Sequence, residues 1–72
     1  MPKLAPSLRK LEQTKEAIIL LLNSCGPADI AEILSEVRVQ AYPGRLPQSL
    51  RELLRDRIIY LAEDGSYQTT GE

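Results

Sequence analysis

Hydrophobic residues in the first third of the chain recur at the three- and four-residue spacing of one face of an α-helix. Ser7 is suited to cap the free N–H groups of the first turn, so the helix is expected to begin at Leu8. Lys15 falls on the apolar stripe and interrupts it. Either the helix extends beyond the core at its N-terminal end, or it breaks near Thr14. The stripe consists of Leu8, Leu11, Ile18, Ile19 and Leu22.

A second helix is predicted over about residues 30–37. The first helix should end within residues 23–27, because the Gly-Pro pair there favours a C-terminal cap and cannot continue a helix. Asp29 and Glu32 have the spacing of a capping box, in which each side chain accepts from the backbone N–H of the other. Residues 26–28 could form a short strand that pairs with a later hairpin. The apolar face of this helix is Ile30, Ile33, Leu34 and Val37.

A third helix is predicted over about residues 47–57, with Pro47 in its first turn. Before it, Pro43 holds Tyr42 in an extended conformation and forms a turn signal with the glycine that follows. The connection over residues 38–46 is about twice as long as the turn of a plain helix-turn-helix. The buried stripe of the third helix is Leu50, Leu53, Leu54 and Ile58, and the side chains expected outside are Gln48, Ser49, Arg51, Glu52, Arg55 and Asp56.

The end of the chain is predicted to form a β-hairpin. If residues 63–65 make a three-residue loop with the glycine in the left-handed conformation, Leu61 pairs with Tyr67, and these two residues close the core. A two-residue turn at the Asp-Gly pair would instead pair Leu61 with Gln68 and mix polar and apolar residues on each face. The three-residue loop is the more self-consistent. Its apolar face is Ile59, Leu61, Tyr67 and Thr69.

The chain has 72 residues, enough for one domain at most. Its 43% hydrophobic content and formal charge of −1 are typical of a soluble globular protein. One cysteine and no histidine exclude an intrachain disulfide, a Cys/His metal site and histidine acid–base chemistry within these residues. Cys25 is expected to be a small packing residue. Since there is also no nucleophile–base pair and no phosphate-binding glycine loop, we expect no enzyme activity, no cofactor and no small-molecule substrate.

The longest apolar run, residues 17–22, is far too short to span a bilayer, so no membrane partner is expected. No apolar segment of the kind found in signal peptides follows Lys3. A cytoplasmic location is therefore expected, or a nucleoid-associated one if the chain binds DNA.

Charge is distributed in blocks along the chain. Residues 1–15 carry four bases and one acid, and residues 38–57 carry five bases and two acids. Residues 16–37 carry four acids and no base, and residues 58–72 carry three acids and no base. A molecule with such separated charge can engage DNA through one basic face although its total charge is slightly negative.

The order of helix, capped helix, helix and hairpin resembles the winged helix-turn-helix superfamily. The resemblance is carried most clearly by residues 50–67, a leucine-rich helix followed by an apolar strand, an acidic turn with glycine, and a tyrosine. It implies a mainly α fold with a small antiparallel β-hairpin (α+β): three helices plus a C-terminal wing over residues 8–70. Residues 1–7 would then be an irregular N-terminal segment, and residues 71–72 a frayed tail.

The resemblance implies a small sequence-specific DNA-binding protein, a transcriptional regulator that reads double-stranded DNA with its third helix. Arginine can read guanine through two hydrogen bonds, Gln48 suits adenine, and Ser49 suits a phosphate at the helix N-terminus. The wing tip, residues 63–66, is acidic, whereas wings that grip DNA generally carry Arg or Lys there, so the tip is not expected to enter a groove. The residues implied at the interface are Arg45, Gln48, Ser49, Arg51, Glu52 and Arg55.

A monomer of this size offers few phosphate contacts, so a dimer or a larger assembly is expected to be needed for useful affinity, and the N-terminal helix is the expected contact of a homodimer. Leu4, Leu8 and Leu11 could form an exposed ridge for that contact. The ridge could instead pack back on its own domain, which we favour because a small domain needs all of its core. The alternative function is a winged-helix protein-interaction module, or a subunit of a larger assembly, that does not bind DNA itself.

Overall fold

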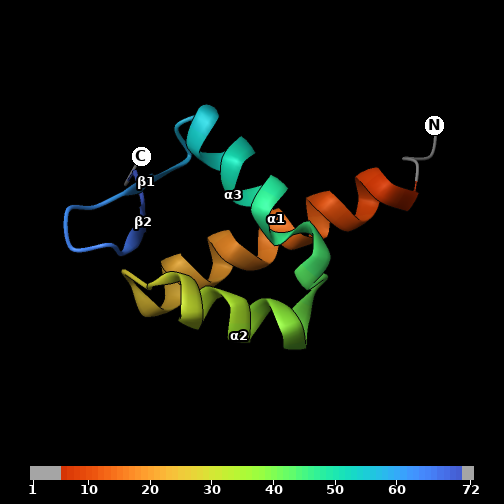
Figure 1. Cartoon of the computed structure of the whole chain (residues 1–72), viewed down its shortest axis with the longest axis horizontal. Coiled ribbons are helices and arrows are strands. Elements are labelled where there is room, and N and C mark those ends of the chain that lie inside the picture. The colour runs from red at the N-terminus through yellow and green to blue at the C-terminus, as the bar shows by residue number, and fades with distance from the viewer. Residues whose placement is uncertain (1–5, 71–72) are drawn as a thin grey trace.

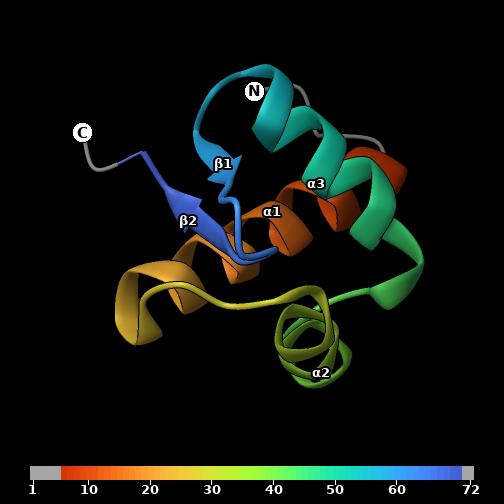
Figure 2. The ribbon, with the colours of Figure 1, turned by 60° about the vertical axis from the view of Figure 1, so that its left-hand side comes forward.

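The central element of the fold is a long helix, α1 (Pro6–Cys25), which lies between α2 (Ile30–Gln40) and α3 (Leu46–Arg55) (Figures 1 and 2). The computed structural model describes residues 6–70. A short 3₁₀ turn, η1 (Pro43–Arg45), leads into α3. Strands β1 (Ile59–Leu61) and β2 (Tyr67–Thr69) form a two-stranded antiparallel hairpin near the end of α1. The chain is therefore mainly helical with a small antiparallel sheet.

The core gathers apolar side chains from all three helices and from β1. Ile18, Ile33 and Leu53 are essentially inaccessible to solvent, and Ile59 closes the cluster from the hairpin. The remaining buried members are Leu22, Ala28, Val37, Leu46 and Leu50. No helix within residues 6–70 has both the length and the apolar character needed to cross a membrane.

Helix α1 is continuous and begins two residues earlier than expected. Its first residue is Pro6, which has no backbone N–H to leave unpaired in a first turn. Ser7 therefore lies inside the helix, and its predicted role as N-cap is wrong. Thr14 does not break the helix: its side chain is fully buried, and its hydroxyl donates to the Lys10 carbonyl at 2.8 Å.

The end of α1 follows the sequence prediction. Gly26 has a positive φ of 79°, and its N–H donates to the Leu22 carbonyl at 3.0 Å, an αL cap. Cys25 is exposed, so its predicted role as a packing residue is wrong; the helix turns its last residue toward solvent. The expected third strand is reduced to one bridge, in which Ala28 and Tyr67 exchange N–H···O bonds of 3.1 and 2.8 Å.

Helix α2 begins as predicted and ends later. The Asp29 side chain accepts from the Glu32 N–H at 2.9 Å, which confirms this half of the capping box. The helix continues to Gln40, because no residue disfavours it until Tyr42, which is extended before a proline. The connection to α3 is thus residues 41–45, shorter than predicted. Ile30, expected on the apolar face, is 47% exposed.

The hairpin has the predicted register, with Leu61 opposite Tyr67. Gly65 has a φ of 88°, and the Ala62 N–H donates to the Ser66 carbonyl at 2.8 Å, as a three-residue loop requires. Tyr67 is half-buried against the core, whereas Leu61 is 53% exposed. The prediction that Leu61 closes the core is therefore wrong, because the hairpin extends past the ends of the helices beyond β1 (Figure 1).

Helix α3 ends in a Schellman motif with an arginine at its left-handed position. Arg57 has a φ of 61°, and its backbone N–H donates to the Leu54 carbonyl, while the Ile58 N–H donates to the Leu53 carbonyl. The left-handed conformation costs an L-residue about 1–2 kcal/mol. Arg57→Gly is therefore expected to raise the free energy of unfolding by about 0.5–1 kcal/mol, after the greater chain entropy of glycine is deducted.

Urea denaturation measures this change. Arg57→Ala is the matched control, because it removes the same charge and keeps the backbone strain. A gain with alanine equal to that with glycine would mean that the charge, not the backbone, limits stability.

Candidate nucleic-acid interface

The outer face of α3 carries two arginines and a glutamine. Leu46, Leu50 and Leu53 are buried against the core, so the residues on the opposite side of the helix face solvent. Gln48, Arg51 and Arg55 are separated by three and four positions, which places them in one row, and all three are exposed. The side chains of this row donate hydrogen bonds and carry two positive charges.

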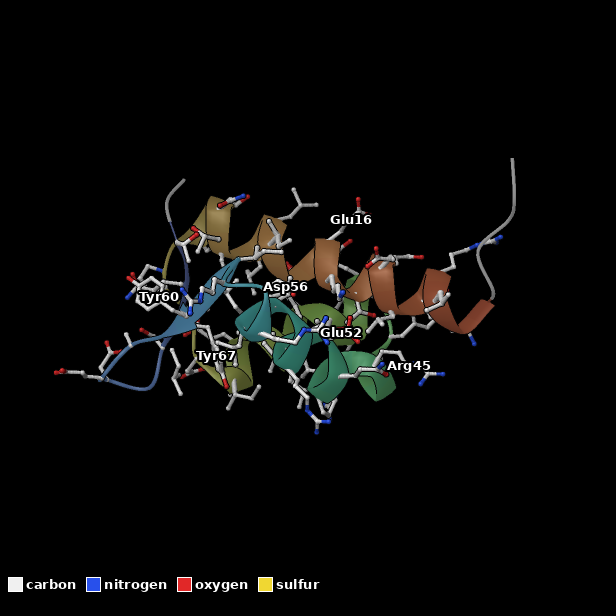
Figure 3. The ribbon with its side chains drawn as sticks, turned by 90° about the horizontal axis from the view of Figure 1, so that it is seen from above. Glu16, Arg45, Glu52, Asp56, Tyr60 and Tyr67 are labelled. Atoms are coloured by element: carbon white, nitrogen blue, oxygen red, sulfur yellow. The ribbon has the colours of Figure 1, made fainter. Side chains whose placement is uncertain are left out.

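Glu52 is the only acidic residue of α3, and an ion pair neutralises it. Its carboxylate lies 2.6 Å from the Lys15 ammonium of α1, and it also accepts from the Gln48 amide at 3.1 Å. Both side chains of the pair are largely shielded, with 17% and 20% of their surface exposed. Glu52 thus points toward α1 (Figure 3). It was expected to contact DNA beside the arginines, but its charge is neutralised by Lys15.

The ion pair shifts the pKa values of both Glu52 and Lys15. Hydrogen bonding to Lys15 is the main cause that holds the pKa of Glu52 below its ordinary value, and the Gln48 amide adds to it. The hydrogen bond to Glu52 raises the pKa of Lys15 above its ordinary value, against the opposing effect of burial. The pair therefore stays charged at neutral pH.

A pH dependence of stability follows from the lowered pKa of Glu52. Such a carboxyl stabilises the fold above its unfolded pKa and loses this contribution as the pH falls through its folded pKa. As the pH falls below about 4.5, the ordinary pKa of glutamate, the unchanged chain should therefore lose more stability than Glu52→Gln, measured by urea denaturation at each pH. Parallel curves for the two proteins would contradict the stabilising role of the pair.

Ser49 is not on the outer face. Its side chain is fully buried, and its hydroxyl donates to the Arg45 carbonyl at 2.7 Å. The prediction that Ser49 contacts DNA is wrong because position 49 lies in the same row of α3 as Leu46 and Leu53. A serine can occupy this row because a backbone acceptor one turn earlier satisfies its hydroxyl.

Arg45 lies at a basic corner that the sequence did not indicate. It is half-buried just before α3, and Tyr42, which starts the same turn, has its ring 5.4 Å from the Lys10 ammonium of α1. Thr14 also approaches this corner, with its hydroxyl 3.5 Å from the Tyr42 carbonyl. A shallow cavity of about 290 Å³ is lined by Lys10, Tyr42, Pro43, Gly44 and Arg45. Only the basic charge of the first residues hinted at Lys10, and nothing local linked it to Tyr42.

The remaining predicted residues are placed less favourably. Arg55 is exposed, and its guanidinium lies 3.3 Å from the Asp56 carboxylate, a contact that solvent weakens. Leu11 is 5% exposed and Leu8 is 49% exposed, so they form no continuous exposed ridge. Leu4 lies outside the described residues. Of the two alternatives for the ridge, partner contact or packing on its own domain, the second is correct for Leu11, because its side chain is buried.

The tip of the hairpin, residues 63–66, carries a stable negative charge. The Asp64 carboxylate accepts from the Ser66 hydroxyl at 2.7 Å and from the Ser66 N–H at 3.0 Å. These bonds hold the pKa of Asp64 below its ordinary value. Within residues 6–70, no cluster of three or more acidic or cysteine side chains is placed to hold a metal ion.

Comparison of the chain with protein-family models, with curated proteins and with solved structures found no match. Its function is therefore inferred from its own surface.

Proposed function

We propose that the protein is a small winged-helix DNA-binding protein that inserts α3 into the major groove. Three features support the winged-helix assignment: the order of the elements, the hairpin after α3, and the bridge between Ala28 and Tyr67 that ties the hairpin to the segment before α2. The observation that carries the DNA-binding proposal is the outer row of α3, where Gln48, Arg51 and Arg55 stand clear of the core and Glu52 is neutralised by Lys15.

The dimensions of α3 suit a groove. An α-helix with its side chains is about 10–12 Å in diameter, and the major groove of B-DNA is about 12 Å wide, so the groove admits it. The 10 residues of α3 span about 15 Å along the helix axis. Arg51 and Arg55 can each donate two hydrogen bonds to a guanine, and Gln48 can pair with an adenine once it leaves Glu52. The residues of α3 proposed to contact bases are thus Gln48, Arg51 and Arg55. Ser49 is removed from the predicted contacts, and Glu52 holds Gln48 in the free protein.

The basic corner supplies the phosphate contacts in this proposal. Arg45 and Lys10 present positive charge beside the start of α3, where the backbone of a bound duplex would pass. Such contacts fix position but do not read sequence. The acidic wing tip stays away from the phosphates, and the wing serves chiefly to cover the core through Ile59 and Tyr67.

We propose regulation of transcription as the role of the protein. With so few basic contacts, one chain should bind weakly, so two copies on adjacent half-sites are expected at a regulatory site. Leu8, half-exposed on α1, is the described residue that could contribute to a contact between copies.

An NMR titration with a nonspecific duplex at low salt tests the proposal. Amide shifts are expected in residues 45–57 and around Lys10, and they should weaken steeply as salt is raised, since binding releases counterions from DNA. Unchanged spectra at low salt would overturn DNA binding. They would favour the second candidate, a protein-interaction module, which is supported by the exposed apolar residues Leu20 and Val39.

A further inference from the structure

A groove on the side of the domain away from α3 combines an apolar floor with an acidic rim. Its apolar lining is formed by Ala17, Leu20 and Leu21 of α1, and Leu20 is 65% exposed, so it is available to a ligand. Glu16 and Glu36 flank the floor from α1 and α2. The groove has a volume of about 300 Å³. Figure 3 shows Glu16 at the edge of α1 directed away from α3.

The spacing of the floor residues suits a helix as the ligand. Positions 17, 20 and 21 are neighbours on one face of α1, so they form a row along the helix. An amphipathic helix laid beside this row would insert its own apolar residues between α1 and α2, the mode in which helices bind grooves. No lysine or arginine is among the described residues that line the groove.

The charge of the groove indicates which kind of helix it would bind. Seven of the nine lining residues fall within residues 16–37, the segment with four acids and no base, and the charged side chains among them are Glu16 and Glu36. We propose that this groove binds a partner protein through a basic amphipathic helix, whose apolar side meets Leu20 and whose lysines or arginines flank Glu16 and Glu36. No residue of α3 lines this groove, so the chain could hold DNA through α3 and a protein through the groove.

The single cysteine makes the site measurable. Cys25 is exposed and lines one end of the groove, so its alkylation by a maleimide reports occupancy. The probe is a synthetic helical peptide of two heptads, with leucines at helical spacing flanked by lysines. The matched peptide carries glutamate in place of each lysine. The lysine peptide is expected to slow alkylation at least threefold and to shift the amide resonances of residues 16–25 and 36–40, and the glutamate peptide should do neither.

Three variants of the full chain assign the contacts. Leu20→Ser should weaken lysine-peptide binding about tenfold, and Glu16→Gln with Glu36→Gln about three- to tenfold, because each exposed ion pair contributes modestly. Glu63→Gln removes one acid from the wing instead and should leave affinity unchanged. Unchanged circular dichroism in all variants separates loss of binding from loss of fold.

Other results would overturn the proposal. Equal binding of both peptides would mean that charge does not select the ligand. Peptide-induced shifts centred on residues 58–70 would place the contact on the wing. A dimer of the free chain that dissociates in Leu20→Ser, seen by sedimentation, would mean that a second copy occupies the groove. None of these outcomes bears on DNA binding by α3.

Discussion

Leu53→Ala is expected to lower the free energy of unfolding by about 2–5 kcal/mol. Leu53 is 1% exposed and belongs to the cluster that joins all three helices and β1. The truncation loses the transfer free energy of the removed atoms and leaves a cavity that neighbours from separate elements cannot easily fill. A domain of this size has little stability to spare, so the loss is large enough to leave a substantial unfolded fraction.

Urea denaturation followed by circular dichroism measures the change. Leu61→Ala is the matched control, because Leu61 is 53% exposed and its truncation should cost less than about 1 kcal/mol. A midpoint for Leu53→Ala close to that of the control would show that Leu53 is not part of the core.

The features predicted correctly from sequence are those that depend on short spacings. The cap at Asp29, the end of α1 at the glycine and the three-residue hairpin loop each follow from groups within a few positions of one another. The main exception is the start of α1, where a serine suited to capping lies just after a proline that begins the helix itself. Competing local signals of similar strength leave such a boundary undecided.

The features that sequence reasoning missed are those that depend on contacts between distant elements. Polarity alone predicts an exposed Ser49 and a buried Leu61. The serine is instead buried because its side of α3 faces the core, and the leucine is exposed because the hairpin projects beyond the helices. In the local pattern, Lys15 only interrupts the apolar stripe of α1. In the structure, it forms an ion pair with Glu52 on another helix. A pairing across 37 positions leaves no trace in local pattern.

These contacts change the electrostatic picture of the candidate interface. Taken from sequence, residues 38–57 carry five bases and two acids, but the sequence does not show which of these charges share a face. The ion pair turns Glu52 toward α1 and neutralises it, and the approach of Lys10 to Tyr42 adds a cation beside Arg45. The acids of residues 16–37 lie on α1, α2 and the turn between them, not on α3. The acids of residues 16–37 therefore do not offset the charges of Arg51 and Arg55 on the outer row of α3.

The double variant Arg51→Ala/Arg55→Ala is expected to weaken binding to a labelled duplex of random sequence by about 10- to 100-fold at low salt. On a duplex of random sequence an arginine in the groove acts mainly through its charge, so each guanidinium lost should also decrease the slope of log affinity against log salt, by at most about one. Both side chains are exposed, so the free energy of unfolding should change little. Fluorescence anisotropy at several salt concentrations measures affinity and slope together.

Arg38→Ala is the matched control for this double variant. Arg38 is an exposed arginine in the last turn of α2, and α2 is separated from α3 by α1 (Figure 1). If the α3 row is the reading surface, removing this charge should change affinity less than about threefold. A loss for Arg38→Ala as large as that for Arg51→Ala alone would mean that DNA responds to the general charge of the domain. Unchanged affinity for both α3 arginines would remove α3 as the recognition helix, because no other exposed row of that helix carries two cations that could reach a groove together.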